Sequence, residues 1–210
     1  MSAWQFLINH HVEVLVATRE HLTLVGISMF IAVSFAVPLG MLLISRPRSR
    51  SVALAVASVF QTIPSLALFG FLIPLPFIGG IGPRTAIVAL VLYALLPILR
   101  NTCVGLANID PSILESAEAL GMTESQILFR VRLPMATSVI LAGIRTATVI
   151  TIGVATIAAA IGAGGLGTFI FRGVAMVSDA VILAGAIPAA LLALAADFLL
   201  SLVERRLRVV

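Results

Sequence analysis

The sequence predicts an all-α protein, a polytopic membrane helix bundle of about five transmembrane helices. Of its 210 residues, 60% are hydrophobic and 10% are charged, whereas soluble globular chains carry roughly 25% charged residues. Several uncharged stretches reach about 20 residues, the length that a helix needs to cross a bilayer. They lack the alternation of hydrophobic and polar residues that is typical of membrane β-strands. We therefore expect one compact bundle without a separate soluble domain.

The same composition argues against several function classes. All thirteen basic residues are arginine, and a Walker A phosphate loop requires a lysine, so the chain is not expected to hydrolyse ATP. The net charge of +4 is attributed to loops beside the membrane rather than to nucleic-acid binding. Cys103 has no disulfide partner, and His10, His11 and His21 lack the spacing of a metal site. No catalytic residue, metal ligand or cofactor site is predicted in this chain.

The first half of the chain contains the first three predicted spans. Residues 1–20 carry apolar residues at helical spacing, which indicates an extracytoplasmic amphipathic helix lying in the membrane interface, with a frayed terminus as the alternative. The spans are expected at 22–45, at about 52–73 and at about 84–106. The first ends at a basic loop, 46–50, and a Pro/Gly turn at 74–83 follows the second.

The second half begins with a polar insert and contains two further spans, at about 136–160 and 180–202. The stretch 162–179 between these spans is rich in glycine and too short to cross the membrane. It is predicted to be a loop with a re-entrant or interfacial helix. Its glycines are compatible with an extracellular gate, with a docking loop for a binding protein, or with tight helix packing.

The distribution of arginine predicts the orientation of the spans. Nine arginines fall on one side, namely Arg46, Arg48, Arg50, Arg100, Arg130, Arg132, Arg205, Arg206 and Arg208. Only Arg19, Arg84 and Arg172 fall on the other. Because positive charge collects on the cytoplasmic side, the N-terminus is expected outside and the C-terminus in the cytoplasm. The membrane domain is then 21–205, with a cytoplasmic loop at 108–136.

That cytoplasmic loop holds four of the nine acidic residues of the chain. It spans about 30 residues, whereas helix connections are usually about 2–8 residues long, so an ordinary solvated connection is the less favoured interpretation. Asp110-Pro111 is typical of a helix start and Gly121 of a helix stop. Thr123 and Gln126 form a capping box that begins a second short helix, and Leu133-Pro134 is predicted to end it.

The insert resembles a known family motif. Glu115-x-Ala117-x3-Gly121, followed after nine residues by Val131-x-Leu133-Pro134, is similar to the EAA loop of permease subunits of binding-protein-dependent ABC importers. Ser116 and Val131 are mild departures from that pattern. The resemblance extends over about residues 20–205. Within the family, Leu92–Gly105 and Ile157–Gly173 most resemble the glycine betaine/carnitine/choline (osmoprotectant) permeases.

The resemblance implies a type I ABC importer (MetI-like) permease fold in a bacterial or archaeal cytoplasmic membrane. It implies separate ATP-binding subunits that bind ATP and Mg, a second permease subunit that is identical or paralogous, and an extracytoplasmic substrate-binding protein. The first insert helix is expected to dock in a groove of the ATP-binding subunit. The docking residues expected are Ile113, Leu114, Glu115, Ala117, Glu118, Leu120, Gly121, Leu133 and Pro134.

A few polar residues inside the spans are candidates for the translocation pathway. Arg145 would cost roughly 2.5–3.5 kcal/mol in hydrocarbon, so it is expected to face the bundle or water, with Thr148 and Thr151 on the same helical face, or else to snorkel. Asp197 is expected to pair with a neighbouring helix or to lie near the interface. Gln61, Thr62 and Ser65 flank Pro64, where they line the pathway or satisfy freed backbone groups.

The predicted function is therefore import of a small osmolyte such as glycine betaine, choline or carnitine. Another solute, such as an amino acid, is the first alternative. An ion-coupled transporter acting alone, a membrane scaffold and an intramembrane enzyme are less favoured alternatives. An ion-coupled transporter would need acidic residues inside the spans, and an intramembrane enzyme would need a catalytic pair.

Overall fold

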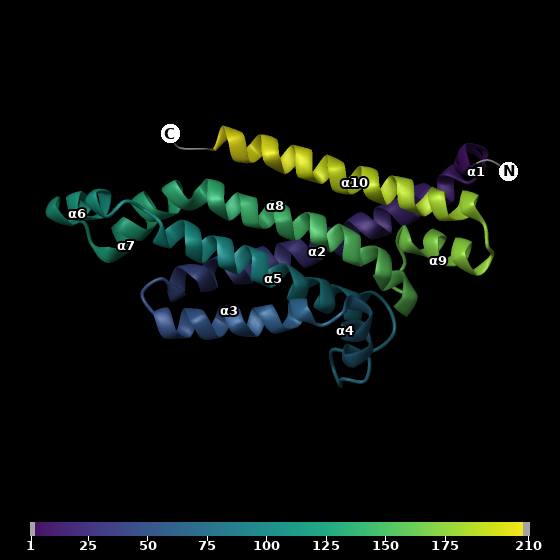
Figure 1. Ribbon diagram of the computed structural model, residues 1–210, viewed down its shortest axis with the longest axis horizontal. Helices are drawn as coiled ribbons and strands as arrows, with labels where there is room; N and C mark the ends of the chain where they lie inside the picture. Colours follow the sequence, from purple (N-terminus) through teal and green to yellow (C-terminus); the bar gives the residue numbers. More distant parts are fainter. Residues whose placement is uncertain (1–2, 208–210) are drawn as a thin grey trace.

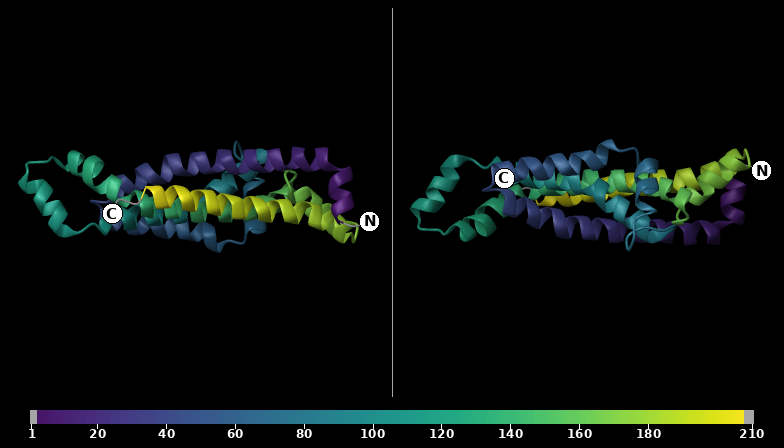
Figure 2. Two further views of the ribbon diagram at one scale, coloured as in Figure 1. Left: turned by 90° about the horizontal axis from the view of Figure 1, so that it is seen from above. Right: turned by 90° about the horizontal axis from the view of Figure 1, so that it is seen from below.

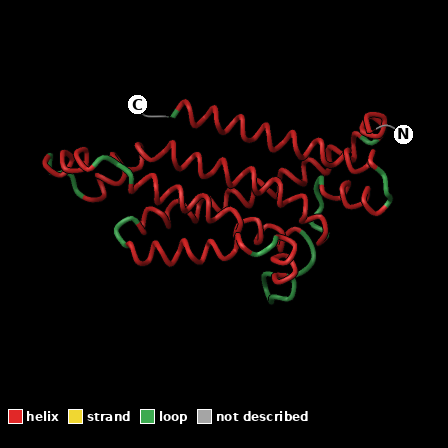
Figure 3. Tube along the Cα trace, in the orientation of Figure 1, coloured by secondary structure: helices red, strands yellow, loops and turns green. Residues whose placement is uncertain are grey.

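The computed structural model describes residues 3–207, and within that range the chain forms helices and loops but no strand (Figure 3). Arg208, which contributed to the orientation argument, lies outside the described residues. The elements are α1 (Ala3–Asn9), α2 (His11–Leu43), α3 (Pro47–Thr62), α4 (Ser65–Leu72), α5 (Pro83–Ala107), α6 (Pro111–Ala119), α7 (Glu124–Ile127), a π-helical turn (Leu128–Arg132), α8 (Leu133–Ile157), a 3-10 turn (Ala158–Ile161), α9 (Gly167–Ala175) and α10 (Asp179–Arg206).

The long helices lie side by side along the long axis of the molecule (Figures 1 and 2). Helices α6 and α7 project beyond the others at one end, which we call the insert end. Helices α1 and α9 lie at the opposite end, which we call the distal end. Among the described residues, four helical segments are long and apolar enough to span a membrane, and the bent pair α3–α4 makes a fifth if it counts as one span. The prediction of about five spans is confirmed.

Helix α5 occupies the centre of the bundle, because α2, α3 and α8 all pack on it (Figure 1). Two glycines allow α2 and α8 to approach α5 closely. A Cβ at Gly40 of α2 would lie 2.6 Å from Thr102 Cγ2, and one at Gly143 of α8 would lie 2.6 Å from Asn101 Cβ. Small residues at such crossings let backbones approach and are the usual means of packing helices in a membrane. The central core is therefore set by these two crossings on α5.

The distal end has a second, smaller core, which includes residues of α1, α2 and α9. The Phe6 ring of α1 stacks on His10 and meets Phe169 of α9 edge-on. Helix α2 begins at His11 instead of residue 22, because nothing in residues 11–20 interrupts helical backbone bonding. The apolar positions expected on the interfacial helix, such as Trp4 and Leu15, remain exposed.

The second predicted span is broken near its middle. It begins at Pro47, and α3 and α4 meet at an angle of 101°. Pro64 has no N–H, and its ring drives Ile63 into the extended region, with φ −71° and ψ 127°. The span expected over 52–73 is therefore two helices, and its break falls at Pro64, the proline expected to interrupt it. The Pro/Gly turn after it is confirmed as a loop from 73 to 82.

The prediction that Leu133-Pro134 ends the second insert helix is also wrong. The chain stays helical from α7 into α8 through a π-helical turn, in which the Leu133 N–H donates to the Leu128 carbonyl five residues back. A wider turn accommodates a proline ring at the second position of α8. The insert is thus joined to the fourth span without a flexible loop.

The crossing of α5 and α8 is expected to be sensitive to a single methyl group. Gly143→Ala should destabilise the protein by about 1–3 kcal/mol, since the new Cβ would also lie 2.8 Å from the Pro97 carbonyl oxygen. The melting temperature of the purified protein in detergent should fall by roughly 2–4 °C per kcal/mol. Gly153→Ala in the same helix is the control, because a Cβ there meets no atom within 4 Å. Equal melting temperatures for the two variants would contradict the assigned packing.

Candidate functional site

The first insert helix, α6, has well-defined ends. The Ser112 backbone N–H donates to Asp110 Oδ1 at 2.9 Å, and this bond lowers the pKa of the Asp110 carboxyl below its usual value. At the other end, Gly121 has φ +78°, and the Gly121 and Met122 N–H groups donate to the carbonyls of Glu118 and Ala117. These two bonds are a Schellman motif. The predicted cap at Asp110 and stop at Gly121 are both confirmed.

The turn after Gly121 leads directly into α7. Thr123 Oγ1 accepts from the Gln126 N–H, and Gln126 Oε1 accepts from the Thr123 N–H at 2.9 Å, which confirms the predicted capping box. Ala117 of α6 and Ile127 of α7 are buried. The two short helices are therefore held as one unit rather than as a flexible loop.

The residues predicted to dock a partner fall into two groups. Ala117 is 5% exposed and supports the fold of the insert, whereas Leu120 is 82% exposed at its tip. Ile113, Glu115, Glu118, Gly121 and Pro134 are exposed, and Leu114 and Leu133 are half-buried. Pro134 lies at the start of α8, whereas the other exposed members belong to α6 and the turn after it, in the part of the molecule that projects furthest from the bundle (Figure 2).

The insert is anchored to the bundle on its inner side. Arg132 donates from Nη1 to the Leu106 carbonyl at 2.9 Å, which satisfies one of the last carbonyls of α5. A groove of about 630 Å³ separates the insert from the ends of α2 and α3, and Arg50, Glu118, Glu124 and Arg132 contribute its charged groups. A movement of the insert would therefore be transmitted to both α5 and α8.

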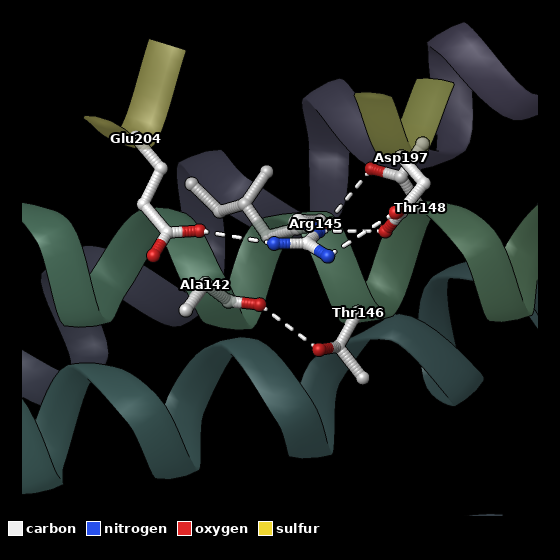
Figure 4. A network of polar contacts seen from close by, with 7 residues as sticks. Ala142, Arg145, Thr146, Thr148, Asp197 and Glu204 are labelled. Atoms are coloured by element: carbon white, nitrogen blue, oxygen red, sulfur yellow. Dashed lines mark hydrogen bonds and ion pairs between the residues drawn. The ribbon is translucent and has the colours of Figure 1, made fainter. Parts of the chain in front are cut away.

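Arg145 makes the main polar contact within the spans (Figure 4). Its Nε lies 2.6 Å from Asp197 Oδ1 and its Nη2 lies 3.1 Å from Oδ2. Nη1 also lies 3.4 Å from Glu204 Oε2. Arg145 belongs to α8 and both carboxylates belong to α10, so the cluster joins these two helices. The expected pairing of Asp197 with a neighbouring helix is confirmed. The pathway role and the snorkelling considered for Arg145 both stay predictions.

The two threonines expected beside Arg145 differ in their surroundings. Thr148 lies beside Arg145 and Asp197 (Figure 4). Thr148 Oγ1 donates back to the Ile144 carbonyl of its own helix. Thr151 is fully buried, with Oγ1 3.6 Å from the sulfur of Met29 on α2. A pathway role for the two threonines stays a prediction.

The polar residues around Pro64 are engaged with the backbone. Pro97 of α5 has no N–H, which leaves the Tyr93 carbonyl without its helical partner. Gln61 Nε2 donates to that carbonyl at 3.1 Å, and the Tyr93 hydroxyl donates to the Ile63 carbonyl in return. Thr62 Oγ1 donates to the Val59 carbonyl. These bonds favour the interpretation that the side chains near the break satisfy freed backbone groups.

At the distal end, α2 holds the glycine-rich loop before α9. The Gly165 N–H donates to Glu20 Oε2 at 2.9 Å. Gly164 and Gly165 have φ of +81° and +80°, and Cβ atoms there would lie 2.5 Å from Glu20 Oε2 and 3.2 Å from His21 Nδ1. His21 is fully buried and contacts the Ile152 carbonyl through Nε2 at 3.2 Å. This close contact favours tight packing as the reason for the glycines.

Several of these residues were not identified from the sequence alone. Arg132 was counted only for orientation, and Glu20, Tyr93 and Glu204 were given no role. Glu20 and Glu204 carried a signal, because each is an acidic residue at the end of a long apolar stretch. No sequence pattern pointed to Arg132 and Tyr93, because their partners are backbone carbonyls distant in the sequence. Within the described residues, no cluster of His, Cys, Asp and Glu has the arrangement of a metal site.

The chain is similar to known transport proteins. Residues 28–209 match the family described as the binding-protein-dependent transport system inner membrane component. The chain is 42% identical to the choline transport system permease protein of Bacillus subtilis (strain 168), over 97% of this chain and 92% of that protein. It is 45% identical to the carnitine transport permease protein of Listeria monocytogenes, over 96% and 91%. It is also 45% identical to the osmoprotectant import permease protein of Salmonella typhimurium, over 87% and 86%.

Solved structures show the same fold. The MetNI methionine ABC transporter, in inward-facing conformations, matches with a TM-score of 0.82 and 26% identity over 92% of this chain and 95% of that chain. An amino acid ABC transporter with histidines matches with a TM-score of 0.79 and 20% identity over 96% and 97%. The predicted type I importer permease fold is thus confirmed.

The ion cluster between α8 and α10 yields a direct test. Reversal of one charge, in Arg145→Asp or Asp197→Arg, places like charges together and should lower both the melting temperature and the yield of folded protein. The double reversal Arg145→Asp with Asp197→Arg should restore at least half of the loss. Thermal unfolding in detergent provides the measurement, and Arg172→Gln, at an exposed arginine of α9, is the control. Additive losses in the double variant would show that the two side chains do not stabilise each other.

Proposed function

The chain belongs to the family of binding-protein-dependent transport system inner membrane components, and we propose that it is a permease subunit that imports a small quaternary-ammonium osmolyte. It is a multi-pass membrane protein, and the family implies ATP-binding and substrate-binding partners. The observation that carries the proposal is the polar insert. It is a rigid pair of helices that projects from the bundle and presents an exposed apolar tip.

The insert has the features of a docking element. Leu120 exposes 82% of its surface beside the exposed carboxylates of Glu115 and Glu118. An apolar anchor flanked by charges is typical of a protein interface. Within the described residues, neither glutamate side chain makes a hydrogen bond or an ion pair. Both carboxylates are therefore available for a basic group of a separate ATP-binding subunit.

The connection from the insert to the spans supports a mechanical role. Because α7 continues into α8 through the π-helical turn, a displacement of the insert would move the fourth span directly. Arg132 transmits the same displacement to the end of α5. ATP and Mg would bind to the partner subunits, whose closure would move the permease between outward-open and inward-open states.

We further propose that the insert end is cytoplasmic and that the distal end faces the substrate-binding protein. The excess of arginine at the insert end supports this orientation. The functional unit would contain two permease subunits, identical or paralogous, and two ATP-binding subunits. If the solute pathway lies between two permease subunits, two chains of about five spans each form it together, and no single chain has to enclose it.

The osmolyte assignment is supported by the relatives, whose names specify choline, carnitine and osmoprotectant transport. The spans themselves contribute little to solute recognition. An aromatic cage for a quaternary amine needs several free ring faces, whereas Tyr93 is only 7% exposed. We therefore assign recognition of the solute mainly to the binding protein.

Docking can be tested at the tip of the insert. Leu120→Asp should weaken the complex with the ATP-binding subunit by about 30-fold or more, since a central apolar anchor contributes about 2 kcal/mol and a buried charge adds to the loss. Because Leu120 is exposed, the melting temperature of the isolated permease should not change. Affinity is measured by pull-down or by light scattering of purified subunits.

Leu207→Asp is the matched control for that experiment, because it changes another exposed leucine at the insert end but outside the insert. It should leave the complex intact. If Leu120→Asp binds the ATP-binding subunit as tightly as the unchanged protein, the insert is not the docking element.

The solute is tested by uptake into proteoliposomes that contain the complete complex. ATP-dependent accumulation of labelled glycine betaine, choline or carnitine is expected. Accumulation of amino acids alone would refute the osmolyte assignment. Uptake driven by an ion gradient without ATP would instead identify a secondary transporter.

A further inference from the structure

The groove of about 630 Å³ beside the insert, which we call the insert groove, contains charged side chains without partners. Arg50 of α3 is half-buried there, and its side chain makes no hydrogen bond or ion pair with a described residue. Glu118 and Glu124 line the insert side of the groove and are likewise unpaired in the described part of the chain. Arg132 donates to a backbone carbonyl through Nη1 and has further N–H groups. Unpaired charges that are partly removed from water are costly, so the groove has the character of a site for a ligand with charges of both signs.

An apolar pocket lies further along the same helices. Helices α2 and α3 pack on α5 more than on each other, and they lie apart in both views of Figure 2. Between them is a pocket of about 210 Å³, which we call the α2–α3 furrow. Its lining includes Leu39 of α2, Ala53 and Phe60 of α3 and Leu99 of α5, and it contains no charged residue. The furrow is therefore suited to a hydrocarbon chain.

The insert groove and the α2–α3 furrow lie in line along α3. Arg50, Ala53, Ala57 and Phe60 are spaced by three or four residues, so they share one face of that helix. Arg50 lines the groove, and the other three line the furrow. The helix rises roughly 15 Å from Arg50 to Phe60, which is half of the hydrocarbon thickness of about 30 Å. This face thus has a charge at the membrane surface and is apolar over the depth of one leaflet.

We propose that the insert groove and the α2–α3 furrow together bind one molecule of phosphatidylethanolamine. Its phosphate binds Arg50 and Arg132, because a guanidinium offers several N–H groups to phosphate oxygens. Its ammonium group binds Glu124, and one acyl chain lies in the furrow. Glu118 belongs to the docking helix α6 and is left to the ATP-binding subunit. Two guanidiniums and two carboxylates match a net-neutral headgroup better than an anionic one.

The dimensions and the surroundings favour a lipid over a protein segment. A helix with its side chains is about 10–12 Å wide, so a helix of a second permease subunit does not fit a furrow of about 210 Å³. An acyl chain enters from the bilayer, because Leu42 beside the groove and Phe35 beside the furrow are 72% and 58% exposed. The inference requires only that α2 and α3 lie in a membrane. It is independent of the transported solute, and only the choice of the cytoplasmic leaflet rests on the proposed orientation.

The headgroup is tested by phospholipid binding to the complete complex. Delipidated complex is titrated with phosphatidylethanolamine or phosphatidylglycerol, and bound lipid is counted by native mass spectrometry. One phosphatidylethanolamine should bind for each copy of this chain, at least about tenfold more tightly than phosphatidylglycerol. Arg50→Gln should weaken that binding about tenfold or more, since it removes charged donors to the phosphate. Arg48→Gln is the matched control, because Arg48 is exposed in the same turn of α3 and does not line the groove.

The carboxylate is tested by lipid preference rather than by affinity alone. Glu124→Gln should reduce the preference for phosphatidylethanolamine over phosphatidylglycerol to less than about threefold, because the ammonium group loses its anionic partner. A merely structural role of Glu124 would weaken the binding of both lipids equally and leave the preference unchanged.

The acyl chain is tested in the furrow. Ala53→Phe should lower the affinity at least about tenfold by filling the space, whereas Val52→Phe, at an exposed neighbour outside the lining, should not. Photo-cross-linking by phosphatidylethanolamine with a diazirine in its acyl chain needs no substitution. It should label residues 53–60 of α3 in the unchanged complex even if Ala53→Phe fails to assemble.

Four results would overturn the proposal. Equal affinity for the two lipids would show that phosphate alone is recognised. Unchanged binding in both Arg50→Gln and Ala53→Phe would place the lipid elsewhere, and cross-links confined to the exposed side of α10 would show only general contact with lipid. Cross-linking of a benzophenone on Ala53→Cys to the second permease subunit would show that protein fills the furrow. None of these results decides the transported solute, which the uptake assay tests separately.

Discussion

The close packing of α2 and α8 on α5 is the constraint on which the rest of the structure depends. Gly40 and Gly143 leave no room for a methyl group at the two crossings. In a bilayer, apolar helices gain little from the hydrophobic effect on association, so close contact between backbones supplies much of the attraction. Helix α10 lacks a comparably buried face and is tied to α8 through an ion cluster.

The same framework explains how the insert can act at a distance. The insert is held by its own caps, by Arg132 on the end of α5 and by unbroken helix into α8. A flexible connection would absorb a displacement, whereas a capped helix pair transmits it. The two elements that receive this displacement, α5 and α8, are also the two that pack most closely. The proposed lipid site lies beside this connection, between the insert and the ends of α2 and α3.

Prolines interrupt helical hydrogen bonding in the spans, and two of the freed carbonyls, those of Tyr93 and Ile63, accept from side chains. Pro97 frees the Tyr93 carbonyl, which Gln61 satisfies, and Tyr93 itself bonds the carbonyl of Ile63 at the α3–α4 break. Such pairing is obligatory where no water is available to the backbone. Polar residues beside a broken helix can therefore serve the backbone, so their position alone does not identify a translocation pathway.

The sequence by itself determined the number of spans, the capped helix pair of the insert and the left-handed turn at Gly121, because these depend on local composition and on backbone preferences within a few residues. It also indicated that Asp197 needed a partner. It indicated a break at Pro64 but not the 101° angle between α3 and α4. It could not determine that α2 begins at His11 or that α7 continues past Pro134. At each of these positions the local sequence is compatible with more than one backbone conformation, so the sequence pattern alone does not choose between them. The partner of Asp197 and the exposed side of α8 were decided only by tertiary packing, because helical periodicity groups residues on a face but does not say what that face meets.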